Sequence, residues 1–278
     1  MKKIIAMLLT AAISVSLIAC GSSAGSGSSA PQDAAAAEGT ASAEGAESEA
    51  LADGKLIVGT NAEFPPFEYL GDNGEPDGFD MALIKAIGEK LGVEVEIQNM
   101  EFGSLITSIG SKIDIAVAGM TVTEERKNAV DFSASYYDAV QFVILPADST
   151  IAESKDLLGK TIGCQLGTTG EYLIDDLIAE DGTTQKKSYN KAVDAVNDLL
   201  NGRLDCVIID KNPAMVFQSN YPDQLKLTEG AAFGFEAEQY AIAMPKGDTA
   251  LAEKINAALA EIRTDGTFDK LVEQYIQN

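Results

Sequence analysis

The apolar positions of this chain alternate between short continuous runs and longer stretches with helical spacing. The continuous runs at 56–59 and 113–118 are typical of buried strands, and 93–97 alternates as a strand does. The stretch 79–91 carries apolar residues three or four positions apart, as one face of a helix does, and 104–109 indicates a second, shorter helix. This strand–helix–strand–helix–strand order predicts a parallel sheet with helices on both faces.

A second copy of this pattern follows along the chain. It predicts strands at 161–164, 186–189 and 204–209, with helices at 170–179 and 192–200 between them. In both copies a helix, a glycine-containing turn and an aspartate precede the last buried strand. Two sheets with the same connections imply two similar lobes, so the predicted fold class is α/β.

The chain is expected to cross between the lobes twice. A strand at 141–145 leaves the first lobe, and the segment 236–241 leads back to it. The predicted first lobe is 53–138 with 240–278, and the second is 139–239. The C-terminal part completes the first lobe with helical faces formed by Leu251, Ile255, Leu259, Ile262, Leu271 and Tyr275.

The first 52 residues differ in composition from the rest. Two lysines precede an apolar stretch at 4–19, which is shorter than the roughly 20 residues of a membrane span. The stretch ends in Leu-Ile-Ala-Cys, which resembles a bacterial lipobox and implies a signal peptide 1–19 and a lipid on Cys20. The alternative is a plain secretory signal with an incidental cysteine. The rest of 20–52 is almost entirely Gly, Ser, Ala and acids, which predicts a disordered tether.

Composition narrows the chemistry further. The net charge is −23 and the basic residues are scattered, which argues against binding to nucleic acid or to an anionic membrane. The chain contains no histidine, which excludes histidine-based acid–base catalysis, Ser-His-Asp triads and histidine-ligated metals. Cys164 and Cys206 lie in apolar strand-like runs, where buried free thiols are the usual outcome, and a disulfide between them is the alternative.

Polar and aromatic residues gather at the ends of the predicted strands. In open α/β sheets, ligands bind beyond the carboxyl ends of the strands. In the first lobe the residues at or beside those ends include Thr60, Asn61, Glu63, Phe64, Phe67, Ala118, Gly119, Met120 and Thr121. In the second lobe they include Gln165, Gly167, Thr168, Thr169 and Asp210. Because both lobes contribute such residues at corresponding places, the sequence predicts a ligand cleft between them.

One cation lies at an unusual place in this pattern. Thr123 is a good N-cap for a short helix, and Glu124 and Glu125 suit the positive end of its dipole. Arg126 lies in the same first turn, against the dipole, and therefore needs a negative partner. Either the neighbouring glutamates neutralise it on the surface, or its guanidinium binds an external carboxylate through two parallel hydrogen bonds.

Two features of the second lobe complement Arg126. Asp210 ends a buried strand, where it either caps a helix that begins at Asn212 and Pro213 or holds an ammonium group. The Gly-Thr-Thr-Gly segment at 167–170 precedes a helix, so its N–H groups and hydroxyls suit a carboxylate, although a capped helix start also explains them. A cation in one lobe and an anion in the other fit a zwitterionic ligand.

Five segments, in order along the chain, resemble the periplasmic-binding-protein family that serves ABC importers of polar amino acids. They are GTNAEFPPFEY, GFDMALIKAIGEKLG, AGMTVTEERK, VDFSASYY and QYAIAMPKG, and the resemblance covers essentially everything after residue 53. It implies a two-lobed periplasmic-binding-protein-like fold of type II, in which each lobe is a parallel-rich sheet flanked by helices. Two hinge strands, near 136–140 and 236–240, would join the lobes.

The same resemblance implies a role for the candidate residues. Arg126 would hold the α-carboxylate of an amino acid, helped by Gly119, Thr121 and Thr169. Asp210 would take the α-ammonium together with the carbonyl of Gly119. The residues implied around the ligand's side chain are Phe64, Phe102, Asn61 and Gln165, although the two aromatic rings also suit plain packing between the lobes.

The identity of the ligand stays open among arginine or lysine, glutamine, histidine and cystine, with the basic amino acids favoured. Several binders of that family carry Asp where this chain has Asn61, so Glu63 is either a substitute anchor for a cationic side chain or a solvated loop acid. The resemblance implies a monomeric binding protein without cofactor or metal, lipid-anchored outside the cell membrane, with ABC permease subunits as partners. Two rival functions are an enzyme similar to cyclohexadienyl dehydratases, with Glu63 or Glu238 as its acid, and a ligand sensor that contacts a receptor.

Overall fold

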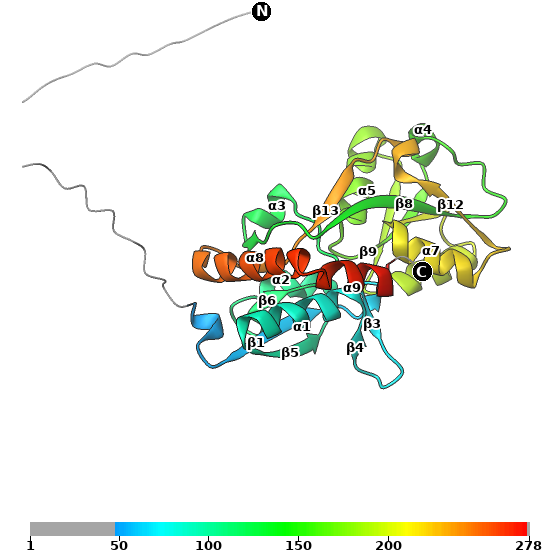
Figure 1. The fold of residues 1–278 in the computed structure, drawn as a ribbon. Coiled ribbons are helices and arrows are strands. Elements are labelled where there is room, and N and C mark those ends of the chain that lie inside the picture. The colour runs from blue at the N-terminus through cyan, green and yellow to red at the C-terminus, as the bar shows by residue number, and fades with distance from the viewer. Residues whose placement is uncertain (1–47, 277–278) are drawn as a thin grey trace, which may run out of the picture. The chain divides into compact units, whose positions relative to one another are not determined.

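The computed structural model describes residues 48–276, which belong to one compact unit. The predicted signal peptide, Cys20 and nearly all of the predicted tether lie outside the described residues. Two large sheets divide the described part into two lobes (Figure 1). Lobe 1 contains both ends of this part, and lobe 2 is formed by its middle. Among residues 48–276, no helix is long and apolar enough to cross a membrane.

Lobe 1 is built on a five-stranded sheet with the order β5–β1–β6–β14–β7. β1 (Lys55–Thr60) pairs in parallel with β5 (Glu94–Asn99) on one side and with β6 (Ile115–Ala116) on the other. β14 (Ala243–Pro245) is antiparallel to β6, and β7 (Val130–Phe132) lies at the edge. Because β1 and β6 are parallel neighbours, the segments that follow them leave the same edge of the sheet.

Alternate residues of these strands face two different layers of helices. Three helices pack together on one side: α1 (Phe79–Leu91), α8 (Thr249–Thr264) and α9 (Thr267–Tyr275) (Figure 1). Residues that belong to this core include Leu56, Val58, Leu83, Ile84, Ile87, Ile115, Val117, Leu251, Ile255, Leu259 and Ile262. The other side carries η2 (Phe102–Ser104) and α2 (Leu105–Ser108) over a core that contains Ala116, Ala118 and Met120. The short η1 (Glu49–Leu51) precedes β1.

The last strand of the first copy is shorter than the predicted 113–118. The N–H of Val117 still donates to the carbonyl of Gly59 at 3.0 Å, but regular pairing has already stopped. The chain then bends at Gly119, whose φ is +52°. A Cβ at this bend would lie 3.0 Å from the ring of Phe64, so glycine allows the backbone to approach the aromatic side chain.

Lobe 2 repeats the arrangement with the strand order β10–β9–β11–β8–β12. β9 (Thr161–Gln165) pairs in parallel with β10 (Gln185–Tyr189) and with β11 (Cys206–Asp210). β8 (Tyr137–Pro146) and β12 (Leu225–Glu229) complete the sheet in antiparallel directions. The predicted second copy is therefore confirmed, with both parallel pairs in the expected order.

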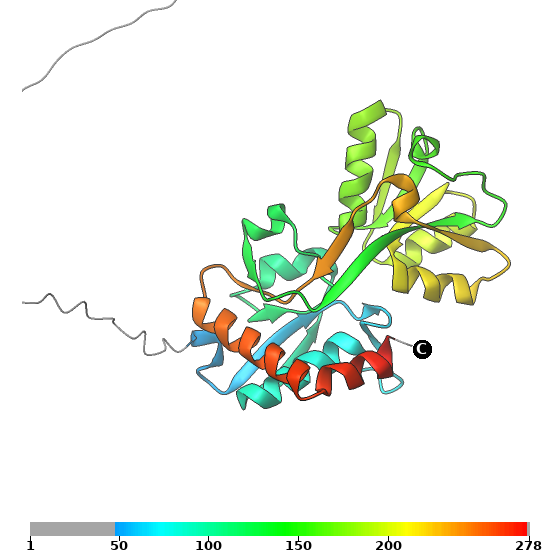
Figure 2. The same cartoon turned by 45° about the horizontal axis from the view of Figure 1, so that its top comes forward.

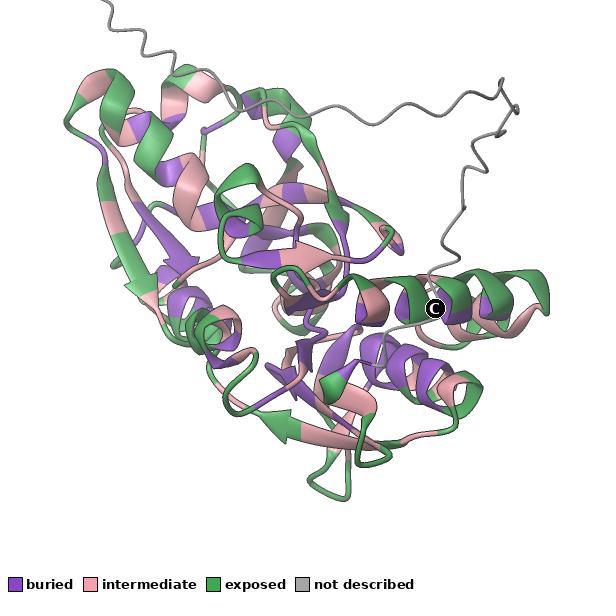
Figure 3. Ribbon diagram, turned by 90° about the vertical axis from the view of Figure 1, so that its left-hand side faces the viewer, coloured by how far each residue is buried: buried purple, intermediate pink, exposed green. Residues whose placement is uncertain are grey.

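Helices cover both faces of this second sheet. Buried residues of α5 (Thr169–Asp181) pack with alternate strand residues such as Ile162 and Ile208, whereas those of α6 (Ala192–Leu200) pack with Val207 and Ile209. Figure 3 shows buried and exposed residues alternating along the helices, as expected for helices that cover a sheet on one side only. The remaining helices of lobe 2 are α4 (Ser154–Leu157), α7 (Lys211–Asn220) and η3 (Gly230–Phe233). Cys164 and Cys206 are buried free thiols, so the predicted usual outcome holds and the disulfide is absent.

Two antiparallel strands run between the lobes (Figure 2). The first four residues of β8 pair with β13 (Ala237–Tyr240), with Tyr137 opposite Tyr240 and Val140 opposite Ala237. The predicted crossing points near 136–140 and 236–240 are thereby confirmed. A small sheet that the apolar pattern did not predict lies in lobe 1, formed by β2 (Glu63–Phe64), β3 (Glu68–Leu70) and β4 (Pro76–Asp77).

Candidate functional site

A cavity with about 310 Å³ of empty space, part of it open to solvent, lies where the two sheets present their strand ends. Every residue around it except Glu68 is a candidate from the sequence. The lining residues are Asn61, Phe64, Glu68, Phe102, Ala118, Gly119, Thr121, Arg126, Gln165, Thr168, Thr169 and Asp210. The strand-end argument therefore located one cavity from residues that are up to 149 positions apart in the sequence.

Arg126 is the positive side chain of this cavity. It lies in α3 (Glu124–Lys127), where the predicted N-cap Thr123 accepts a hydrogen bond from its backbone N–H at 3.1 Å. Its guanidinium donates to the carbonyl of Thr121 at 2.6 Å and to that of Gly167 at 2.9 Å. The side chain is buried, and burial lowers its pKa.

Arg126 has no carboxylate partner at ion-pair distance within residues 48–276. Glu124, the neighbour that would have neutralised it, pairs with Lys127 at 2.7 Å instead. The guanidinium lies over the rings of Phe102 and Tyr172, at 5.5 and 5.9 Å from their centroids. A buried cation that is held by carbonyls and aromatic faces retains its unbalanced charge, so the cavity attracts an anion at this end.

Asp210 is the negative group contributed by lobe 2. It is the last residue of β11 and stands at the N-cap position of α7, yet its side chain makes no capping hydrogen bond. The hydroxyl of Tyr240 donates to it instead. The helix begins at Lys211 and Pro213 is its third residue, so the predicted start at Asn212 was one residue late. Burial, followed by the charge of Glu238, raises the pKa of Asp210 to about 7.

Hydrogen bonds between the lobes surround the cavity. The side-chain amide of Gln165 donates to the side-chain oxygen of Asn61 at 2.8 Å, and the amide of Asn61 donates to the carbonyl of Met100 at 3.0 Å. These two predicted residues therefore bind each other across the cleft. Arg126 makes the second such contact through Gly167, so the structure has the two lobes closed against one another.

Glu238 connects both lobes through the strand β13. Its Oε2 accepts hydrogen bonds from the hydroxyls of Thr121 at 2.6 Å and Thr169 at 2.9 Å, and from the amide of Gln141 at 3.3 Å. It lies behind the lining residues and does not line the cavity. This role could not be predicted from the sequence, because an acid in a short polar strand has the pattern of a solvated surface residue.

Glu68 is the lining residue that the sequence analysis missed. It is 1% exposed, and no N–H or hydroxyl group of the described residues donates to either carboxyl oxygen, although the carboxyl group of Asp80 hydrogen-bonds with it. Burial raises its pKa well above the ordinary value, and the neighbouring carboxyl groups of Asp80 and Asp210 raise it further. Its position in the small sheet β2–β3–β4 explains the miss, because no apolar periodicity marks that sheet. The cavity thus contains a second acidic group besides Asp210.

Some residues near the predicted strand ends do not line the cavity, namely Thr60, Glu63, Phe67, Met120 and Gly167. Glu63 forms an ion pair with the half-exposed Lys191 of lobe 2 through one carboxyl oxygen, while the other is buried without a hydrogen-bond partner among the described residues. Met120 is 1% exposed and packs in the core of lobe 1, while its backbone carbonyl accepts a hydrogen bond from the N–H of Ala241 at 3.1 Å. Strand ends predict which segments reach a site, but the alternation of side chains decides which residues face it.

Comparison with known proteins gives the family. The model of the bacterial extracellular solute-binding proteins, family 3, matches residues 56–278. One relative, the arginine-binding extracellular protein ArtP of Bacillus subtilis (strain 168), is 37% identical over 286 residues, which cover 99% of this chain and 98% of its own. An ancestral arginine-binding protein solved with bound arginine has a TM-score of 0.75 and 40% identity over 80% of this chain and 98% of its own. A structure of an ancestral arginine-binding protein bound to glutamine has a TM-score of 0.74 and 40% identity over 81% of this chain and 99% of its own.

These matches confirm the predicted two-lobed, periplasmic-binding-protein-like α/β fold. The family model spans both lobes, and the relatives are similar along nearly their whole length. This chain belongs to the bacterial extracellular solute-binding proteins, family 3.

Proposed function

We propose that this protein captures a free L-amino acid outside the cell membrane and delivers it to an ABC importer. The observation that carries the proposal is one cavity with opposite charges from two lobes, Arg126 from lobe 1 and Asp210 from lobe 2. Arg126 binds the α-carboxylate and Asp210 binds the α-ammonium group. The carbonyl of Gly119, the hydroxyl of Thr121 and the N–H of Thr169 supply further polar contacts to the two α-groups.

The preferred ligand is a basic amino acid, and arginine above lysine. Glu68 supports this preference, because a buried carboxyl group that receives no N–H or hydroxyl donor from the described residues lines the cavity in addition to Asp210. A guanidinium presents several N–H donors to a carboxylate, which a neutral side chain cannot match. The arginine-binding relatives point to the same class. Glutamine is the second candidate, since Asn61 and Gln165 offer neutral amides.

Glu68 takes the anchor role that was one of two alternatives for Glu63, the other being a solvated loop acid. An anchor must reach the ligand, whereas Glu63 is paired with Lys191 and does not line the cavity. Phe64 and Phe102 flank the ligand's side chain, with Ala118 and Thr168 completing the wall. The site therefore keeps the predicted electrostatic plan but draws its side-chain anchor from the small sheet.

Ligand capture is coupled to closure of the two lobes. Arginine first binds lobe 1 through Arg126, and lobe 2 then adds Asp210 and the Gln165–Thr169 loop. Closure is driven by contacts that the open form lacks, such as the bond between Asn61 and Gln165. A shift from a mostly open to a mostly closed population needs about 5.5 kcal/mol of differential affinity. Two or three charge-assisted hydrogen bonds of about 1.5–3 kcal/mol each supply this amount.

The remaining parts of the chain serve its attachment. Residues 1–19 act as a signal peptide, and 20–52 carry the lipid on Cys20 and form a flexible tether. Lobe 1 comprises 53–138 with 240–278, and lobe 2 comprises 139–239. The tether allows a monomeric binding protein to reach its permease subunits while it remains attached to the outer face of the membrane.

Calorimetry across the twenty amino acids, cystine and ornithine tests the proposal. We expect the wild-type protein to bind arginine, and Arg126→Ala to lose at least about a hundredfold in affinity for every amino acid, because a buried charged contact is worth a few kcal/mol. Lys127→Ala is the matched control, since Lys127 is the adjacent, half-exposed cation outside the cavity. Near-wild-type affinity in Arg126→Ala would refute the assignment.

One observation favours a second function on the same scaffold. Glu68 is a buried acid whose pKa is raised by burial, which is how enzymes keep a general acid protonated near neutral pH. Glu63 and Glu238, the acids considered from the sequence, do not line the cavity. Incubation with prephenate or arogenate distinguishes the two functions, because a dehydratase forms an aromatic product and a binding protein returns the substrate unchanged.

A further inference from the structure

The loop between β9 and α5 is the part of lobe 2 that meets Arg126. At its centre, the carbonyl of Gly167 accepts a hydrogen bond from the guanidinium at 2.9 Å. Gly167 also lies directly against lobe 1, because a Cβ built on it would come within 3.2 Å of the Cα of Gly103. The position of this one residue therefore decides how closely lobe 2 approaches the cation that holds the ligand.

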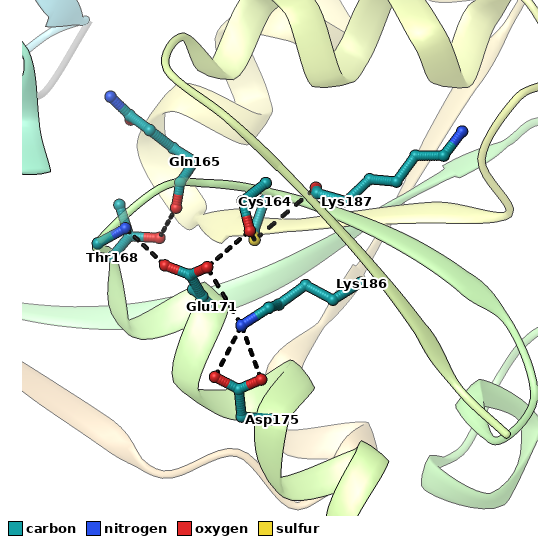
Figure 4. A network of polar contacts seen from close by, with 9 residues as sticks. Cys164, Gln165, Thr168, Glu171, Asp175, Lys186 and Lys187 are labelled. Carbon is teal, nitrogen blue, oxygen red and sulfur yellow. Dashed lines mark hydrogen bonds and ion pairs between the residues drawn. The ribbon is translucent and has the colours of Figure 1, made fainter. Parts of the chain in front are cut away.

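Glu171 fixes Gly167 from inside lobe 2. It is the third residue of α5, where a glutamate commonly accepts a hydrogen bond from the N–H of the N-cap residue. Here its Oε2 instead accepts the N–H of Gly167, one residue before the N-cap Thr168, at 2.7 Å. Thr168 in turn donates its hydroxyl to the carbonyl of Gln165 at 2.8 Å. Figure 4 shows the glutamate beneath the loop.

The other carboxyl oxygen of Glu171 is held by a network that does not reach the cavity. Ser188 donates its hydroxyl to Oε1 at 2.6 Å, and the ammonium group of Lys186 lies 3.2 Å from the same oxygen (Figure 4). Lys186 also pairs with Asp175, at 2.7 Å and 2.8 Å. Burial raises the pKa of Glu171, but these donors and the N–H of Gly167 outweigh it and leave that pKa below the ordinary value. The carboxyl group is thus ionised at neutral pH and held at both oxygens.

We propose that Glu171 is a positioning residue that helps to retain the ligand in the closed form. It holds the N–H of Gly167, and thereby keeps the carbonyl of that residue against the Arg126 guanidinium in the closed form. Glu171 does not line the cavity and acts only through Gly167. The inference rests on the proposed amino-acid-binding function, and it adds a determinant of how long the closed form lasts.

This role predicts an effect on release and none on capture. The ligand enters an open cleft, in which Gly167 has not yet met Arg126, so the association rate constant should not depend on Glu171. The closed form loses one fixed hydrogen bond to a charged group, which corresponds to about a tenfold faster dissociation. A role in folding alone would lower the stability of the ligand-free protein without this division between the two rate constants.

The test compares three variants of the mature chain. Glu171→Ala removes the acceptor, Glu171→Gln keeps an oxygen for the N–H of Gly167, and Asp175→Asn alters only the exposed end of the network. We expect radiolabelled L-arginine, chased with unlabelled arginine, to dissociate about tenfold faster from Glu171→Ala, within about threefold of wild type from Glu171→Gln, and within about twofold from Asp175→Asn. The association rate constants of all three should lie within about twofold of wild type.

A second readout needs no ligand. The amide proton of Gly167 should resonate downfield in the nitrogen–proton spectrum of the free wild-type protein, and should move upfield in Glu171→Ala. Unchanged dissociation from Glu171→Ala, or equally fast dissociation from Glu171→Gln, overturns the inference while wild-type binding of arginine leaves the proposed function intact. A wild-type protein that binds no amino acid overturns both.

Discussion

Replacing Glu68 with glutamine should separate cationic from neutral ligands. Glu68 is almost fully buried, lines the cavity, and receives no hydrogen bond from an N–H or hydroxyl group within residues 48–276. Its substitution by glutamine keeps the shape of the side chain and removes only its ability to become negatively charged when a cation binds. If arginine is bound there through its guanidinium, the loss of one partner from a buried charge pair costs about 2–5 kcal/mol.

We expect the lower end of that range. Burial raises the pKa of Glu68 in the ligand-free protein, so binding a cation must first remove a proton, and this offsets part of the attraction. A loss of about 2 kcal/mol corresponds to roughly a 30-fold weaker arginine complex. Glutamine needs no charge at this position, and its affinity should stay within about threefold of wild type.

Titration calorimetry with arginine and with glutamine provides the measurement. Glu63→Gln is the matched control, because it removes a carboxylate of the neighbouring strand β2 without altering the cavity wall. Wild-type binding of arginine should also release protons, seen as a heat that differs between buffers of different ionisation enthalpy. Equal weakening of both ligands in Glu68→Gln, or no weakening of arginine, would refute the assignment of Glu68 to the ligand's side chain.

Two further predictions concern the protein without ligand. Its thermal midpoint should rise as the pH is lowered from about 7 towards 5. Burial raises the pKa of Asp210 to about 7, so the folded state takes up a proton in this window that an unfolded chain does not. Burial also raises the pKa values of Glu68 and Asp80, which acts in the same direction. Asp210→Asn should flatten this dependence, and an unchanged slope would contradict the argument. Cys164 and Cys206 should resist a thiol reagent until the chain is unfolded, since burial raises the pKa of Cys164 to about 12 and that of Cys206 as well. Rapid labelling of the native chain without Cys20 would show that they are accessible.

Periodicity identified the elements that carry a large buried face. The helix predicted at 192–200 is α6 with the same ends, and 79–91 is α1. Strands with small or polar side chains were harder to predict. The sequence analysis did not predict β7, β12 or β14, because they are short or carry their apolar residues on one side only. Their places follow from pairing with strands far away in the sequence, which a local pattern does not contain.

The candidate site was predictable to the extent that it depends on strand ends. The position of Asp210 follows from the end of a parallel strand, which the alternation of strands and helices already implies, whereas Arg126 was identified by its place in the first turn of a short helix. Glu68 depends on a three-stranded sheet without an apolar signature, and Glu238 depends on how β13 lies against the loop 120–122. Glu63 and Glu68 lie on neighbouring strands of the small sheet, β2 and β3, and only the folded backbone shows which of them lines the cavity.

The connecting strand β13 is part of the site as much as the two lobes are. Glu238 binds Thr121 of lobe 1 and Thr169 of lobe 2, and Tyr240 donates its hydroxyl to Asp210. Opening the lobes must stretch or break at least one of these contacts, because they tie one strand to both sides. The polar groups that receive the ligand and the strand that permits motion are therefore coupled. A ligand that orders Thr121, Thr169 and Asp210 also favours the closed arrangement of β13, which explains how a small molecule in the cavity controls the relative position of two lobes.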